Sequence, residues 1–150
     1  VSAEGGRRGS GPRVLVVDDT PDNQKLAKRM LERAGFVVDL AGSGEMSIAA
    51  AGTEDYDPIL MDIQMPFMDG FEATKAIRAG EAKHERRRTP IIAVTAHAIE
   101  GYREMCIEAG MDDYITKPLK KKTFLEIITR WAAPASVTEN NETTDSGTVI

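Results

Sequence analysis

Short apolar runs alternate with amphipathic segments along the middle of the chain. The first run, residues 13–17 (RVLVV), is apolar after its first residue and lies between Pro12 and a pair of acidic residues. A strand that is buried on both faces has this pattern, because neither of its faces meets water. The same reasoning predicts four further strands, at residues 36–40, 58–61, 90–94 and 113–115.

Helical spacing of apolar residues predicts one helix after each strand. The indicators are, in chain order, Leu26, Met30 and Leu31; the short segment 45–51 of small side chains; Phe71 to Ile77, ending before the charged stretch 81–88; Ile99 to the capping Gly110; and residues 123–131. This alternation favours a parallel sheet with helices on both faces, because each parallel strand needs a right-handed crossover. In such sheets the functional groups lie at the carboxyl ends of the strands.

The chain has 150 residues and a formal net charge of −5, from 19 basic and 24 acidic side chains. This balance argues against a nucleic-acid-binding domain that depends on overall positive charge. Cys106 is the only cysteine, which excludes an internal disulfide and a cysteine zinc cluster. No apolar run reaches the roughly 18 residues of a membrane span and no secretory signal is recognisable, so we expect a cytoplasmic protein with no membrane contact by this segment.

The two ends of the chain differ from its middle in composition. Residues 1–12 are rich in glycine and polar residues without hydrophobic periodicity, which predicts a flexible linker. Residues 133–150 hold mostly polar and acidic side chains, which predicts a disordered linker or tail. One folded domain is therefore expected over residues 13–132. Because the chain begins with Val1, we expect a segment of a longer polypeptide, with removal of an initiator methionine as the alternative.

Polar residues follow the predicted strands at the places where chemistry is expected. They are Asp18 and Asp19, Asp62, Thr95 and Lys117. Three carboxylates that meet at one sheet edge repel one another, a cost that a bound cation relieves. A set of oxygen ligands without His or Cys favours Mg²⁺ over zinc. A hydroxyl and an ammonium group beside the carboxylates suit a bound phosphoryl group.

Taken singly, these residues have simpler interpretations. Asp19 or Thr20 can cap the helix that follows. Asp62 can belong to a turn, and Thr95 and Lys117 can be ordinary polar groups at strand ends. Their joint placement favours one shared site. Other polar and sulfur-containing residues are expected to be structural, with His84 in a solvated loop, Cys106 and Trp131 packed against the sheet, and Met61, Met65, Met68 and Met111 in the core or in turns.

Four fragments at the strand ends are typical of one protein family. They are VVDD (16–19), LMDIQMPFMDG (60–70), VTA (94–96) and YITKP (114–118). Together they resemble the receiver domain of two-component response regulators, the CheY-like family, over about residues 12–132. The resemblance implies a flavodoxin-like, doubly wound α/β fold with a five-stranded parallel sheet of order 2-1-3-4-5 and five helices. Within the family the chain is most similar to the receiver of a hybrid sensor histidine kinase.

The resemblance also implies a role for each site residue. Asp62 would be the phosphoacceptor, whose carboxylate attacks the phosphorus of a phosphohistidine and becomes an acyl phosphate. Mg²⁺ would be held by Asp19, Asp62 and the backbone carbonyl of Gln64, with Asp18 acting through water. Lys117 would neutralise a phosphoryl oxygen.

Further implied roles concern the response to phosphorylation. Thr95 would move to hydrogen-bond the phosphoryl group, and Tyr114 would turn inward with it. Gln64 and His97 would line the entrance and modulate hydrolysis of the acyl phosphate. The Lys117–Pro118 peptide bond would be cis.

These residues predict a phosphoacceptor signalling switch that changes its affinity for partners and catalyses only its own phosphorylation and dephosphorylation. The expected partners are a histidine kinase as phosphodonor and a histidine phosphotransfer domain. The expected context is a hybrid histidine kinase, in the cytoplasmic part of a membrane-bound sensor, with a stand-alone single-domain regulator as the alternative. The input signal, the cognate kinase and the oligomeric state stay open.

Two functions from other classes are the alternatives. A Mg²⁺-dependent phosphohydrolase of the haloacid dehalogenase kind also uses an aspartate after a strand, but it needs a second Asp two residues later, where this chain has Gln64. A module that binds partners without phosphate would not need the acidic set together with Lys117. Both alternatives are therefore less favoured than the switch.

Overall fold

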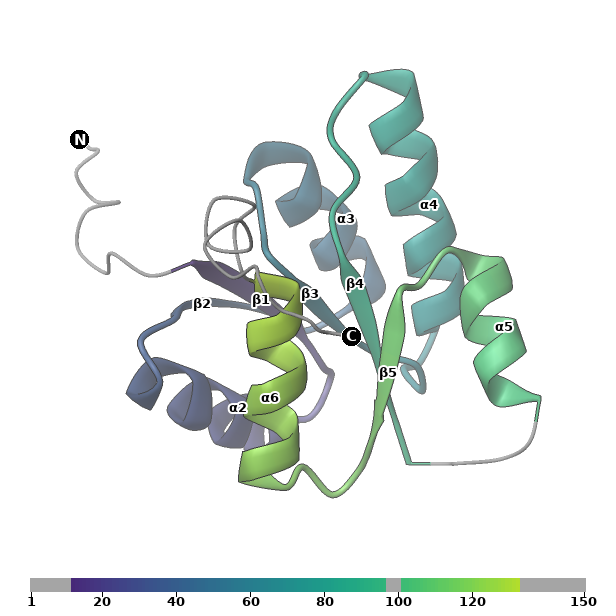
Figure 1. Ribbon diagram of the computed structural model, residues 1–150. Coiled ribbons are helices and arrows are strands. Elements are labelled where there is room, and N and C mark those ends of the chain that lie inside the picture. The colour runs from purple at the N-terminus through teal and green to yellow at the C-terminus, as the bar shows by residue number, and fades with distance from the viewer. Residues whose placement is uncertain (1–11, 97–100, 133–150) are drawn as a thin grey trace, which may run out of the picture.

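The computed structural model describes residues 12–96 and 101–132 and shows five strands in one sheet (Figure 1). The strand order is β2-β1-β3-β4-β5, and every neighbouring pair is parallel. The strands are β1 (Arg13–Val17), β2 (Val37–Ala41), β3 (Ile59–Asp62), β4 (Ile91–Thr95) and β5 (Asp113–Thr116). The predicted doubly wound α/β fold of order 2-1-3-4-5 is confirmed.

Five helices cover the sheet in the described part of the chain. They are α2 (Pro21–Arg33), α3 (Gly44–Thr53), α4 (Gly70–Lys83), α5 (Tyr102–Ala109) and α6 (Lys121–Ala132). Helices α2 and α6 lie on one face of the sheet, and α3, α4 and α5 lie on the other (Figure 1). None of these helices is long and apolar enough to cross a membrane.

The apolar side chains of β1 explain why both faces are covered. Val14 and Val16 belong to the core cluster under α2 and α6, whereas Leu15 and Val17 belong to the cluster under α3, α4 and α5. Successive side chains of a strand point to opposite faces, so a strand between two helix layers is apolar throughout. The sulfur-containing residues expected in the core are buried there, namely Met61, Met65, Cys106 and Met111.

Helix α4 ends later than the sequence predicts. The prediction placed its end before Glu81, because the charged stretch that begins there has no apolar periodicity. The helix continues through Lys83 instead. The Glu81 carboxylate accepts hydrogen bonds from Arg78 at 2.9 Å and from the backbone N–H of Thr89 at 2.9 Å, which fixes the last helical turn against the start of β4. The prediction was wrong because it required apolar periodicity, whereas charged residues continue this helix and the bond from Thr89 lies outside it.

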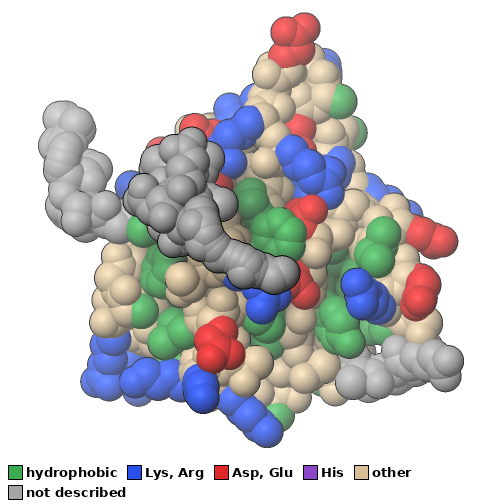
Figure 2. Space-filling model, viewed as in Figure 1, with side chains coloured by type: hydrophobic (Ala, Val, Ile, Leu, Met, Phe, Trp, Pro, Cys, Tyr) green, Lys and Arg blue, Asp and Glu red, His purple; other side chains and the backbone are tan. Residues whose placement is uncertain are grey.

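The charged stretch after α4 is held to the rest of the fold by ion pairs. His84 is exposed at the helix end, as expected. Arg86 and Arg87 bind carboxylates of the loop between α3 and β3, Asp55 at 3.1 Å and Asp57 at 3.0 Å. Arg88 binds Asp112, just before β5, at 2.8 Å. In the view of Figure 2, Lys or Arg side chains lie beside Asp or Glu side chains over the upper part of the molecule. These pairs hold the amino-terminal edge of the sheet.

Arg78 is the most connected side chain at this edge. Its guanidinium donates to the carboxylates of Glu81 and Asp112, each at 2.9 Å, and to the backbone carbonyls of Thr89 and Gly110. Only 14% of the Arg78 side chain is exposed, and the Glu81 and Asp112 side chains are 11% and 14% exposed. Removal of a paired cation that is largely shielded from water lowers stability far more than removal of a surface cation, because its partners are left buried and unpaired.

Arg78→Ala should therefore lower the free energy of unfolding by about 2 to 4 kcal/mol. Urea unfolding followed by circular dichroism measures the change. Lys75→Ala removes an exposed cation of the same helix and should change stability by less than about 0.5 kcal/mol. Equal stability of the Arg78→Ala and Lys75→Ala variants would show that the Arg78 contacts contribute little.

Candidate functional site

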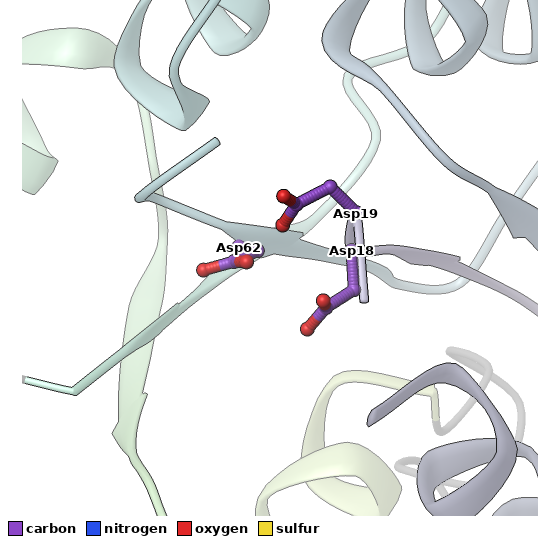
Figure 3. Close-up of side chains that lie close together, drawn as sticks. All are labelled: Asp18, Asp19 and Asp62. Atoms are coloured by element: carbon purple, nitrogen blue, oxygen red, sulfur yellow. The ribbon is translucent and has the colours of Figure 1, made fainter. Parts of the chain in front are cut away.

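Three aspartates meet where β1 and β3 end. Val17 of β1 pairs with Met61 of β3, so the residues after them, Asp18 and Asp62, are neighbours at the carboxyl edge of the sheet. One carboxylate oxygen from each of Asp18, Asp19 and Asp62 lies within 4.8 Å of the others. Figure 3 shows the three side chains extending to the same side of the two strand ends. Asp18 and Asp62 are 5% and 3% exposed, whereas Asp19 is exposed to solvent.

Lys117 supplies a positive charge to this cluster from the loop after β5. Its Nζ lies 3.6 Å from an oxygen of Asp18 and 3.5 Å from Oδ1 of Asp62. The Lys117 backbone N–H donates to the carbonyl of Thr95 at 2.7 Å, which ties this loop to the end of β4. The Lys117–Pro118 peptide bond is cis, as expected, and so is the Asp57–Pro58 bond, which no sequence pattern indicated.

Backbone and amide donors orient the two buried aspartates. The Asp18 carboxylate accepts from the Thr20 N–H at 2.8 Å, and the Asp18 carbonyl accepts from the Gln24 side chain at 2.6 Å. The Asp62 carboxylate accepts from the Gln64 N–H at 3.2 Å. Thr20 occupies the N-cap of α2 without a side-chain capping bond, so its hydroxyl does not cap the helix. Sequence reasoning missed Gln24, because an amide at a helical position gives no signal of its own.

Burial raises the pKa of Asp62 to about 6, and the neighbouring Asp18 charge adds to the increase. The ammonium of Lys117 and the N–H of Gln64 act in the opposite direction but do not cancel it. The charged form of Asp62 is thus costly in the protein without a metal. An additional cation among the oxygens would relieve this cost, and the donor set fits a hard divalent ion.

Gly70 lets α4 begin directly against the end of β3. A Cβ atom at this position would lie 2.5 Å from the carbonyl oxygen of Asp62 and 2.8 Å from the Cα of Ile63. Asp69 caps the helix and forms a reciprocal capping box with Glu72. The Asp-Gly pair indicated a turn and a helix start in the sequence, but the close approach to Asp62 became visible only in the structure.

The residues expected to respond to phosphorylation lie on β4 and β5. Thr95 is fully buried at the end of β4, one residue beyond Val94, which pairs with Asp62 of β3. Tyr114 is half-buried on β5 and packs against the apolar cluster under α5. Gln64 is exposed beside Asp62. His97 lies outside the residues that the structure describes, so its place relative to the site stays a prediction.

The chain matches the family model for the response regulator receiver domain over residues 14–129. It is 42% identical over 124 residues to Sensor protein GacS of Pseudomonas syringae pv. syringae, which covers 83% of this chain and 14% of GacS. It is 37% identical over 137 residues to signal transduction histidine-protein kinase BarA of Shigella flexneri, covering 91% of this chain and 15% of BarA. The chain therefore spans about one seventh of the length of these relatives.

Solved structures give the same result. One is the receiver domain of sensor histidine kinase PA1611 from Pseudomonas aeruginosa PAO1, which has a magnesium ion coordinated in its active site cleft. It is 43% identical to this chain with a TM-score of 0.73, and the match covers 81% of this chain and 98% of that one. The chemotaxis protein CheY4 of Vibrio cholerae is 28% identical with a TM-score of 0.72, covering 80% of this chain and 98% of that one.

Asp62→Asn should raise the free energy of unfolding of the metal-free protein by about 1 to 3 kcal/mol at neutral pH, because the substitution removes a costly buried charge. The sign follows from proton linkage. The folded state binds this proton more tightly than the unfolded chain, so wild-type stability falls as the pH rises from about 4 to about 6 and remains reduced above that range.

Urea unfolding in the presence of a chelator, at several pH values, measures both the difference and its pH dependence. Asp55→Asn removes an exposed carboxylate and should change stability by less than about 0.5 kcal/mol. An Asp62→Asn variant that is less stable than the wild type at neutral pH would contradict the electrostatic account of this site.

Proposed function

This chain belongs to the family of response regulator receiver domains, and we propose that it is a phosphoacceptor switch in which Asp62 takes the phosphoryl group. The observation that carries the proposal is the meeting of Asp18, Asp19 and Asp62 with Lys117 at one edge of the sheet. Carboxylates alone would repel a phosphoryl group. The Lys117 ammonium and a bound divalent ion together reverse that repulsion.

The proposed reaction is phosphoryl transfer to a carboxylate. An oxygen of ionised Asp62 attacks the phosphorus of a phosphohistidine, a P–O bond forms, and the P–N bond breaks as the imidazole leaves. Lys117, already 3.5 Å from Asp62, neutralises a phosphoryl oxygen as the group arrives. The Gln64 N–H and the packing of Gly70 hold the Asp62 carboxylate and backbone in place during the transfer.

The metal site that we propose uses Asp19, Asp62 and the backbone carbonyl of Gln64 as ligands, with Asp18 acting through water. The donor set is composed of oxygen only, and the raised pKa of Asp62 indicates that a cation is favoured there. Magnesium in the related PA1611 receiver supports the choice of ion. Bound Mg²⁺ would supply charge neutralisation of the phosphoryl oxygens.

The proposed response to phosphorylation uses Thr95 and Tyr114. Thr95 is buried at the end of the strand next to β3, from which its hydroxyl can approach a phosphoryl group on Asp62. Tyr114 lies on the adjacent strand and can repack when Thr95 moves. We also propose that Gln64 and His97 modulate hydrolysis of the acyl phosphate.

The proposed setting is a receiver of about residues 13–132 within a hybrid histidine kinase, flanked by linkers and lying in the cytoplasm. The relatives named as histidine kinases support this setting, since this chain matches only a small part of each. A histidine kinase would donate the phosphoryl group, and a histidine phosphotransfer protein would exchange it. A solved complex supports the phosphotransfer protein as a partner: it joins the Saccharomyces cerevisiae histidine phosphotransfer protein Ypd1 to the Ssk1 receiver domain. The match to this chain has 25% identity and a TM-score of 0.79.

Incubation with acetyl phosphate and Mg²⁺ should add one phosphoryl group, detected by intact-mass spectrometry. The Asp62→Asn variant and a chelator-treated sample should show no adduct, and Lys117→Ala should slow its formation by at least about tenfold. Lys120→Ala removes an exposed cation near Lys117 and serves as the matched control. Equal phosphorylation of wild type and Asp62→Asn would exclude Asp62 as the acceptor.

A further inference from the structure

The loop between β3 and α4 presents one aromatic side chain entirely to solvent. Phe67 is 100% exposed, more than any other large apolar side chain in the described part of the chain. Its φ is +69°, and the N–H of Met68 donates to the carbonyl of Pro66 at 2.7 Å, so Phe67 is the central residue of a tight γ-turn. Such turns with positive φ are rare and strained, especially at a residue with a bulky side chain.

The structure around Phe67 holds this loop in place. The N–H of Gly70 donates to the carbonyl of Ile63 at 2.9 Å, which closes the loop at its base. Met65 is buried on one side of the tip, and the capping box of Asp69 fixes the other side. A strained residue persists only where the surroundings determine its conformation, and such residues concentrate at functional sites.

The loop stands beside the proposed phosphoacceptor. The Gln64 N–H near its start donates to the Asp62 carboxylate, and Gly70, the first residue of α4 after it, packs on the Asp62 carbonyl. The Asp62 side chain is only 4% exposed, so a donor imidazole must come close to the loop to reach it. A protein that delivers a phosphoryl group from a histidine side chain must therefore approach the edge of the sheet from which this loop leaves β3.

A second apolar surface borders the same site. A groove of about 340 Å³ runs from Asp18 and Lys117 between α2 and the loop before α6, and Leu26, Ala27 and Leu119 contribute to its lining. Apolar surface that includes the 43% exposed Leu26 thus borders Asp18 and Lys117. This pattern fits a protein donor, because apolar contacts around a polar centre are typical of protein interfaces and unnecessary for a small phosphodonor.

We propose that Phe67 is the apolar anchor with which this receiver binds its protein phosphodonor, and that it inserts into an apolar recess of the surface that carries the phosphohistidine. The proposal rests on the proposed phosphoacceptor function of Asp62. The preformed turn spares the complex the cost of ordering the loop on binding. Phe67 is in this sense a positioning residue for the transfer and takes no part in the chemistry at phosphorus.

The test compares a small donor with a protein donor. The protein donor is the Pseudomonas protegens Sensor histidine kinase GacS, phosphorylated with ATP after deletion of the segment that matches this chain. Phe67→Asn removes the ring and keeps a residue that tolerates positive φ. Transfer from GacS should be slowed by at least about tenfold, with an unchanged rate from acetyl phosphate. Phe67→Leu, which keeps an apolar side chain, should restore part of the rate.

Ile107→Ala is the matched control, because Ile107 is a 56% exposed apolar residue in the last turn of α5. It should transfer as the wild type does. Equal rates from GacS for Phe67→Asn and wild type would overturn the proposal, and so would an equal loss with both donors, since Phe67 would then act on the site itself. Failure of the wild type with acetyl phosphate would instead count against the proposed phosphoacceptor function.

Discussion

The repulsion between Asp18 and Asp62 is the constraint on which the rest of the site depends. Both carboxylates are buried at neighbouring strand ends, and their proximity contributes to the raised pKa of Asp62. Lys117 and the Gln64 N–H offset this cost only in part, and the nearby Asp19 charge adds to it, so the pKa of Asp62 remains raised. The protein thus maintains a site that is unfavourable without a cation and well suited to binding a metal and a phosphoryl group.

The two edges of the sheet have different tasks. At the amino-terminal edge, Arg78 and the arginines after α4 fix the strand starts with ion pairs and backbone hydrogen bonds. At the carboxyl edge, short loops carry buried charges, a strained Phe67 and a glycine that only just fits against β3. Strain and unfavourable charge at a functional edge require a stable structure elsewhere, which the paired edge and the two apolar clusters supply.

Much of this arrangement follows from the sequence, because parallel strands bring their carboxyl ends to one edge. Asp18, Asp62 and Lys117 could be assigned to one site once the strands were located. The end of α4 was predicted wrongly, since charged residues continue the helix without apolar periodicity and the Glu81 contact with Thr89, outside the helix, leaves no pattern in the sequence. The close approach of Gly70 and the exposure of Phe67 could not be predicted either, because both depend on how the loop after β3 closes on itself.

The central claim is that Asp62, and no neighbouring carboxylate, carries the phosphoryl group. Reduction of the phosphorylated wild-type protein with borohydride converts the acyl phosphate carbon to an alcohol and marks the acceptor, which peptide mapping by mass spectrometry then identifies. The account predicts the reduced residue at position 62 alone. A mark at Asp18 or Asp19, or a phosphorylated protein with no reducible aspartate, would contradict it.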